Sequence, residues 1–231
     1  MSYVALFDKD IISEQFGSEK LLDLLLDEGN YRIESSEVRI TKKSIILREN
    51  EVHDYMYILK SGICGAWKDK HITIFLGGHD IIGMNNILAN EQSTLTVTAL
   101  TDVNAWKFSK EEVLKKLMNT QEGIFYLYND VRLANKDLLN KNVLEMEDTE
   151  IRLLCSLLQL GKLYGSENRN IVKLPKIFTK KIISNYLNIT ETTMYIICKQ
   201  LVDAGVLISG QPICINKNVA MDRIGMERLL Y

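Results

Sequence analysis

The stretch "FTKKIISNYLNITETTMYIICKQLVDAGVLI", residues 178–208, predicts two short helices joined by a tight turn. Thr179 precedes the first apolar run and Thr190 precedes the second, and threonine is a favoured residue at the N-cap of a helix. The apolar positions of the second helix recur at intervals of three and four residues, which predicts one buried face: Met194, Ile197, Cys198 and Leu201.

The other face of this second helix is predicted to be exposed, and it carries Thr192, Thr193, Tyr195, Ile196 and Lys199. The following segment "GVLISGQPICI" predicts a β-hairpin with strands at 206–209 and 213–215. Helix, short turn, helix and hairpin together describe a winged helix-turn-helix, whose second helix enters the major groove of DNA. A helical hairpin in an ordinary core has the same apolar spacing, so the pattern alone leaves that alternative open.

Upstream of these helices, residues 38–108 are rich in short strand-like runs separated by turn residues. Strands spaced about 8–12 residues apart are typical of an antiparallel sandwich or barrel. We therefore expect an α+β protein with a β-sandwich before the helix-turn-helix, and a helical segment at about residues 3–30. The predicted strands lie at 44–47, 55–59, 63–67, 71–76, 95–100 and 103–108.

Three helices are predicted between the sandwich and the helix-turn-helix, and the third begins after Asp148 and ends near Gly161 or Gly165. Ser109 is a candidate N-cap, and Glu112 three residues later would complete a capping box. A longer helix at about residues 120–145 has an apolar seam that suits the pairing of two copies in a coiled coil, although a helix packed on its own domain would also show it. The residues of this seam are Ile124, Leu127, Val131, Ala134 and Leu138.

This order divides the chain into a sandwich at 1–109, a helical linker at 110–147 and a DNA-binding domain at 148–231. Residues 148–231 contain 11 Lys/Arg and 7 Asp/Glu, about +4, whereas residues 1–147 carry about −6. A locally basic segment is what contact with nucleic acid requires, because it is the phosphates at the interface that must be neutralised.

Other function classes lack their sequence signals. We expect a cytoplasmic protein without a membrane segment, because no basic leader and no long apolar run is found. Neither a metal nor another cofactor is expected, since Cys64, Cys155, Cys198 and Cys214 are scattered and the histidines have no ligand spacing. The motifs of common hydrolases and nucleotide-binding enzymes are also missing, so catalysis is not expected.

Together, the segment "LRENEVHDYMYILKSGICGAW", the long helix and the helix-turn-helix resemble the Crp/Fnr superfamily of bacterial transcription regulators. The resemblance runs from about Val38 to Ile215. It implies a cyclic-nucleotide-binding-like jelly roll, a homodimer joined through the long helix, binding to a near-palindromic site in double-stranded DNA, and contact with RNA polymerase.

The exposed face of the second helix departs from that family. Thr192 stands where family members commonly carry a Glu, and Ile196 stands where they carry an Arg that reads guanine. Threonine and isoleucine suit thymine methyl groups instead, so we expect an A·T-leaning site. The remaining DNA-binding candidates are Thr179, Thr190, Thr193 and Tyr195, with Lys180, Lys181 and Lys199 as phosphate anchors.

The effector cassette also departs from the family, in the segment "GMNNILANEQSTLTVTA" at residues 83–99. Gly83 is in place, but Met84 replaces a ribose-binding Glu, Ser93 replaces a phosphate-binding Arg, and Thr94 keeps only a hydroxyl. Because a buried phosphate without a cation is costly, cyclic AMP is not expected as the effector. The chain is in this respect closer to the PrfA-like branch, which responds to other small molecules. A sensor or interaction protein with weakened DNA binding is the alternative.

Overall fold

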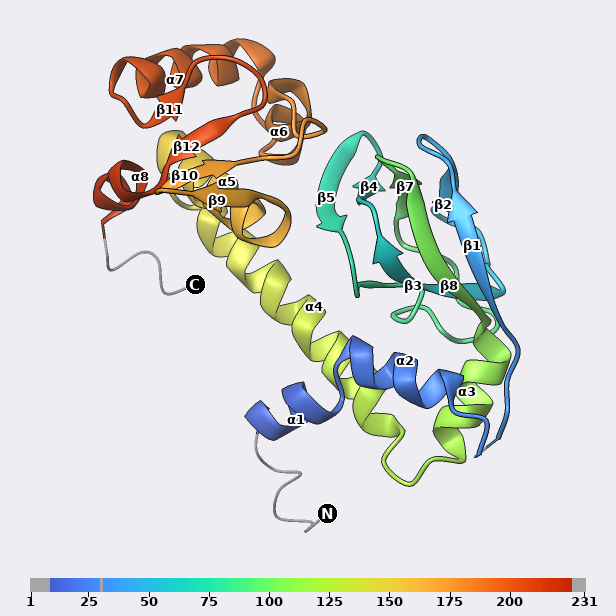
Figure 1. Ribbon diagram of the computed structural model, residues 1–231. Helices are drawn as coiled ribbons and strands as arrows, with labels where there is room; N and C mark the ends of the chain where they lie inside the picture. Colours follow the sequence, from blue (N-terminus) through green and yellow to red (C-terminus); the bar gives the residue numbers. More distant parts are fainter. Residues whose placement is uncertain (1–8, 30, 226–231) are drawn as a thin grey trace. The chain divides into compact units, whose positions relative to one another are not determined.

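The computed structural model describes residues 9–29 and 31–225, and it divides the chain into two compact units, Met1–Lys136 and Asp137–Tyr231 (Figure 1). The predicted N-terminal helical segment contains α1 (Lys9–Gln15) and α2 (Ser18–Leu26). Residues 3–8 and 30 of that prediction lie outside the described residues.

Two four-stranded antiparallel sheets form the first unit, as predicted for a β-sandwich. One has the order β1-β8-β3-β6 and the other β2-β7-β4-β5. The strands of the first sheet are β1 (Ser35–Ile40), β3 (Tyr55–Ser61), β6 (Ile81–Ile82) and β8 (Val103–Ser109). Those of the second are β2 (Ile45–Leu47), β4 (Cys64–Lys68), β5 (His71–Leu76) and β7 (Thr96–Ala99).

Inward-facing strand residues and the flanking helices build two apolar clusters in this unit. One cluster fills the sandwich with Leu47, Leu59, Cys64, Ala66, Ile82, Val97, Ala99, Val103 and Ala105. The other joins α2, β3, β8 and α3 (Lys110–Met118) through Leu21, Leu25, Ile33, Met56, Ile58, Met84, Ile87, Phe108, Val113 and Leu117. The segment 83–99, which is the effector cassette, contributes residues to both clusters. Met84 and Ile87 near its start belong to the second cluster, and Val97 and Ala99 at its end belong to the first.

The predicted capping box at the start of α3 is wrong. Ser109 is the N-cap residue, but its side chain makes no capping hydrogen bond. The Glu112 carboxylate instead accepts a hydrogen bond of 3.3 Å from the backbone amide of Glu34. The Glu34 amide, which is remote in the sequence, therefore binds the carboxylate that the capping box would have used.

The long helix is α4 (Ile124–Glu145), which begins four residues later than the predicted range. Its first part packs against Phe16, the residue that follows α1: Asn129 Nδ2 donates to the Phe16 carbonyl at 2.9 Å, and the Phe16 ring lies 5.2 Å from that of Phe125. The boundary between the two compact units falls within this helix, between Lys136 and Asp137.

The second unit combines helices with one antiparallel sheet of order β11-β12-β10-β9. The β11–β12 pair is the predicted hairpin, with Leu207 opposite Ile215. Gly161 lets α5 (Thr149–Tyr164) approach the sheet, because a Cβ there would lie 2.3 Å from Val172 Cγ1. The elements are α5 (Thr149–Tyr164), β9 (Ser166–Asn168), β10 (Ile171–Lys173), α6 (Lys180–Tyr186), α7 (Glu191–Asp203), β11 (Leu207–Ile208), β12 (Cys214–Asn216) and α8 (Lys217–Ile224).

Candidate nucleic-acid interface

Threonine caps fix the start of both helices in the helix-turn-helix, as the sequence predicts. Thr179 Oγ1 accepts a hydrogen bond of 3.2 Å from the Ile182 amide at the start of α6. At the start of α7, Thr190 Oγ1 accepts one of 3.0 Å from the Thr193 amide. Each cap satisfies a backbone donor that the helix itself leaves without a partner.

The turn between these helices is set by Asn188. Its φ of 54° lies in the left-handed region, which asparagine tolerates better than most residues. The next residue, Ile189, donates its amide to the Ser184 carbonyl at 2.9 Å. The chain therefore reverses within a few residues, and α6 and α7 pack closely together in the second unit (Figure 1).

Helix α7 has one buried and one exposed face, and the division is the predicted one except at Thr193. Met194, Ile197, Cys198 and Leu201 are all buried. On the other side Thr192 and Lys199 are exposed, and Tyr195 and Ile196 are 62% and 51% exposed. Thr193 is half-buried, and its hydroxyl lies 2.8 Å from that of Thr190, so this hydroxyl belongs to the cap. Large apolar side chains left open on a capped helix are a surface that a partner could cover.

The candidate phosphate anchors differ in their surroundings. Lys181 has a side chain that is 80% exposed, and its amine lies 4.0 Å from the Glu191 carboxylate. Lys180 is half-buried, with its amine 5.6 Å from the centre of the Tyr195 ring. Lys199 is exposed on α7 itself. The three amines thus lie beside the exposed face of α7, at or near the surface.

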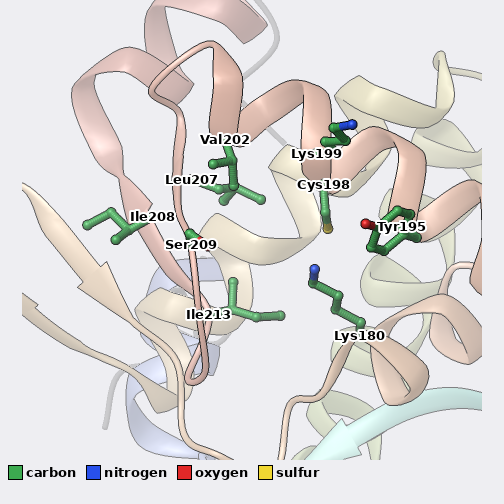
Figure 2. Close-up of a pocket in the computed structure, with 10 residues that line it drawn as sticks. Lys180, Tyr195, Cys198, Lys199, Val202, Leu207, Ile208, Ser209 and Ile213 are labelled. Atoms are coloured by element: carbon green, nitrogen blue, oxygen red, sulfur yellow. The ribbon is translucent and has the colours of Figure 1, made fainter.

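A cavity of about 160 Å³ opens between α7 and the β11–β12 wing (Figure 2). Apolar side chains from both elements form one side of it, and polar groups from α6 and α7 form the other. Burial raises the pKa of the Cys198 thiol at this site, and the nearby Lys180 ammonium opposes that shift. The lining residues are Lys180, Tyr195, Cys198, Lys199, Val202, Leu207, Ile208, Ser209, Gly210 and Ile213.

Three of the four candidate residues in the effector cassette are buried: Gly83, Met84 and Ser93. Gly83 has a φ of 94°, which favours glycine, and Met84 is 3% exposed within the apolar cluster of α2 and α3. Ser93 is buried, and its hydroxyl donates to the Leu95 carbonyl at 2.7 Å. Of the four candidate residues, only Thr94 is exposed. Met84 and Ser93 are therefore engaged in contacts within the protein itself.

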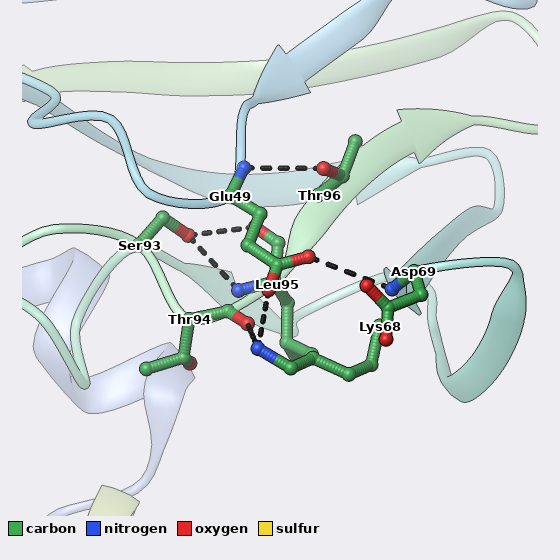
Figure 3. Close-up of polar contacts among 7 residues, drawn as sticks. All are labelled: Glu49, Lys68, Asp69, Ser93, Thr94, Leu95 and Thr96. Atoms are coloured by element: carbon green, nitrogen blue, oxygen red, sulfur yellow. Dashed lines mark hydrogen bonds and ion pairs between the residues drawn. The ribbon is translucent and has the colours of Figure 1, made fainter.

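An ion pair that the sequence analysis missed lies next to Ser93 and Thr94. Lys68 at the end of β4 pairs with Glu49, and the same amine donates to the Thr94 carbonyl at 3.4 Å (Figure 3). The hydrogen bond from Lys68 lowers the pKa of Glu49, and the Glu49 carboxylate raises the pKa of Lys68. The cation beside Ser93 and Thr94 is thus already neutralised. Its partner is 19 residues away, and only the sheet brings the two together.

A second missed residue is Lys110, a buried lysine beneath the cassette. It is 3% exposed, and its amine donates to the Asn86 carbonyl at 2.7 Å. Burial lowers the pKa of Lys110, while the carboxylates of Glu91 and Asp54 oppose that shift. The lysine holds the segment from below, so it supports the cassette rather than lining a site.

The predicted dimer seam on α4 is partly exposed. Leu127 packs against the apolar cluster of its own unit, whereas Ile124 and Val131 are 64% and 50% exposed. At 100° per residue, Tyr128, which is 55% exposed, lies on the same face as these two. Ala134 and Leu138 are also exposed. The exposed apolar line therefore runs through Ile124, Tyr128, Val131 and Leu138. It has Tyr128 where the predicted seam has Leu127.

Known proteins resemble this chain in two ways: sequence matches cover the region of the β-sandwich, and structural matches cover most of the chain. Residues 37–120 match the family model of the cyclic nucleotide-binding domain. Among curated proteins, an isozyme 2 form of the cGMP-dependent protein kinase of Drosophila melanogaster is 28% identical over 83 residues. Those residues are 36% of this chain and 8% of the kinase, so this chain spans a small part of that relative's length.

Solved structures match over most of the chain, and they include Crp/Fnr-family regulators. FixK2 from Bradyrhizobium japonicum has a TM-score of 0.68 at 17% identity, covering 81% of this chain and 96% of that one. A CooA mutant from Carboxydothermus hydrogenoformans has a TM-score of 0.68 at 19% identity, with 90% and 95% covered. A transcriptional regulator of the CRP/FNR family from Thermus thermophilus has a TM-score of 0.58 at 17% identity, with 85% and 99% covered. The chain has the fold of these regulators, a cyclic-nucleotide-binding β-roll followed by a helix-turn-helix.

Two further features concern metals and membranes. Among residues 9–29 and 31–225, no three His, Cys, Asp or Glu side chains gather in a way that could hold a metal ion. No helix in the part of the chain that the structure describes combines the length and apolar character needed to cross a membrane.

Proposed function

We propose that this protein is a sequence-specific DNA-binding transcription regulator of the Crp/Fnr type, that it acts as a homodimer, and that it does not respond to cyclic AMP. The observation that carries the proposal is the two-faced α7. Four buried side chains anchor this helix to its unit, and Thr192, Tyr195, Ile196 and Lys199 remain open to a partner. In a winged helix-turn-helix, that open face is the one that enters the major groove.

The chemistry of this face suits A·T base pairs. Ile196 and the methyl group of Thr192 can contact thymine methyl groups, which lie only in the major groove. Tyr195 adds a large ring with a polar tip. Since none of these side chains offers the paired donors that read guanine, the proposed operator leans to A·T, and DNA shape adds to its recognition.

Phosphate contacts would come from the lysines around α7. Lys180, Lys181 and Lys199 stand at or near the surface beside the reading face, and such contacts position a protein on the duplex without reading sequence. The caps add Thr179 and Thr190 at two helix N-termini, where backbone amides favour anions.

Dimerisation would use the exposed line of α4. Isolated exposed apolar residues are ordinary, but Ile124, Tyr128 and Val131 lie on one face at helical spacing, which is the pattern of a helix that pairs with a second copy. Two copies would place their α7 helices in successive major grooves, about 10–10.5 bp apart, on a near-palindromic operator. RNA polymerase is the further partner that such a regulator requires.

Cyclic AMP is a poor fit for this cassette. A buried phosphate needs a cation, but Ser93 stands in the place of one, and the neighbouring Lys68 is paired with Glu49. A different small molecule, or a resting conformation that already binds DNA, would then set how the two reading helices are spaced, as a shift between two arrangements. For such a regulator we expect a cytoplasmic location and no enzymatic activity.

The test is binding of the purified protein to a pool of A·T-rich intergenic duplexes, followed by fluorescence anisotropy at several salt concentrations. The proposal expects tight binding to a subset of duplexes, with a log–log salt slope that corresponds to several phosphates. Weak and equal binding to every duplex would contradict it and would favour the alternative, a sensor or interaction protein whose DNA binding is weakened.

A further inference from the structure

The cavity between α7 and the wing has an amphiphilic lining that DNA reading alone does not explain. Figure 2 shows three polar groups that point toward one another: the Lys180 amine, the Tyr195 hydroxyl and the Cys198 thiol. The Lys199 amine, by contrast, points away from them (Figure 2). The cavity therefore has one cation at its centre.

The opposite side of the cavity is apolar. Val202 from α7, Leu207 from β11 and Ile213 before β12 face the polar groups across the space (Figure 2). Leu207 and Ile213 are buried in the unit, so this wall is a fixed part of its core. A ligand for such a cavity needs an apolar body on one side and an anionic group on the other.

The Lys180 amine is open to such an anion. Within the part of the chain that the structure describes, it makes no hydrogen bond or ion pair, and its neighbour across the cavity is the Tyr195 ring at 5.6 Å. A carboxylate beside it would gain a charge-assisted hydrogen bond, and the Tyr195 hydroxyl could donate a second one.

The volume limits the size of the ligand. At about 160 Å³ the cavity is close to the roughly 150 Å³ of an engineered apolar cavity that holds benzene. A single aromatic ring or a carbon chain of similar size fits this space. A mononucleotide is larger than that.

We propose that this cavity binds a small monocarboxylate with an apolar body, of the size of benzoate, with its carboxylate on Lys180 and Tyr195 and its body against Val202, Leu207 and Ile213. Binding and DNA reading would compete, because Tyr195 belongs to the exposed face of α7 and Lys180 is a candidate phosphate anchor. The competition rests on the proposed function, whereas the binding site itself does not.

The test begins without DNA. Methyl groups of Val202, Leu207 and Ile213 are followed by NMR while benzoate, benzyl alcohol or inorganic phosphate is added to the full chain. We expect benzoate to shift these methyl signals and to saturate, with a dissociation constant on the order of a millimolar, as befits so small a ligand. Benzyl alcohol has the same body without the charge and should bind about tenfold more weakly or worse.

Two variants with matched chemistry sharpen the result. Lys180→Gln should weaken benzoate binding by about tenfold, whereas Lys181→Gln removes the adjacent lysine, which does not line the cavity, and should leave benzoate binding unchanged. The methyl spectra themselves report whether each variant is folded. Val202→Phe fills the cavity and should abolish the benzoate shifts, while methyl signals remote from the cavity stay in place.

The outcomes separate the two proposals. Unchanged methyl signals at saturating benzoate, equal responses to inorganic phosphate and benzoate, or equal losses in both lysine variants would overturn the carboxylate site. Anisotropy with operator DNA is then measured with and without benzoate. A protein that binds DNA but shows no benzoate shift refutes the site alone, and one that binds benzoate but no DNA refutes the proposed function and leaves the site standing.

Discussion

Thr190 Oγ1 accepts a hydrogen bond of 3.0 Å from the Thr193 amide, and the two threonine hydroxyls lie 2.8 Å from each other. This pair fixes the first turn of α7, the helix that the proposed function places in a DNA groove. Because Thr193 is held in the cap, the candidate residues of α7 that remain exposed are Thr192, Tyr195, Ile196 and Lys199.

Thr190→Ala should lower the free energy of unfolding of the second unit by about 1 kcal/mol, since it removes the cap and leaves the Thr193 amide without its acceptor. Urea unfolding measures this change. Thr190→Ser keeps a hydroxyl and serves as the control. Equal stability of the alanine and wild-type proteins would show that the cap contributes nothing.

Much of this helix-turn-helix could be predicted from the sequence, because its signals are local. A cap lies next to the helix it starts, and buried positions repeat at three and four residues. The capping box at Ser109 and Glu112 failed for the opposite reason: the Glu34 amide that takes the Glu112 carboxylate is remote in the sequence. The Lys68–Glu49 pair was missed for the same cause, as sheet pairing alone brings the two together.

Strand β1 was not predicted from the sequence, because its mostly exposed residues give little apolar alternation. On α4, periodicity located an apolar helix but did not show which apolar residues face its own unit. Leu127 packs against the apolar cluster of its own unit, whereas Tyr128, the next residue, stays exposed.

Val131→Asp should give a monomer in sedimentation velocity, because a carboxylate at the exposed line of α4 would be buried without a partner between two copies. Tyr128→Asp should do the same. The control is Leu133→Asp, since Leu133 is 44% exposed and lies half a turn away from that line. Unchanged sedimentation of the Val131 and Tyr128 variants would refute this dimer surface.

Asp130 predicts a pH dependence of the first unit. Burial, helped by the nearby Asp80 carboxylate, raises the pKa of Asp130 to about 6 from 3.8. Its contribution to stability is therefore complete below about pH 4 and is lost as pH rises through about 6.

Asp130→Asn should accordingly stabilise the protein at about pH 7.5, by up to about 3 kcal/mol, and make little difference at about pH 4. Urea unfolding at both pH values measures this. Asp203→Asn changes an exposed carboxylate on α7 and is the control. A stabilisation by Asp130→Asn that is the same at both pH values would argue against titration of this carboxyl group.

Cyclic AMP should produce no heat of binding in calorimetry and no change in DNA affinity. The physical reason is that Met84 lies in the core, and the Lys68 ammonium is neutralised by Glu49. Glu49→Gln frees that ammonium, so it is the variant in which weak binding of the cyclic phosphate should first become measurable. Saturable binding of cyclic AMP to the wild-type protein would contradict this interpretation of the cassette.

Selection of binding sites from random duplexes shows whether the exposed face of α7 reads A·T-leaning DNA. We expect two near-palindromic A·T-rich half-sites about 10–10.5 bp apart. Ile196→Ala should weaken binding to the selected site about tenfold with the salt slope unchanged, whereas Lys199→Gln should reduce that slope by about one. A half-site dominated by G·C, or a selection that enriches no sequence at all, would contradict the claim.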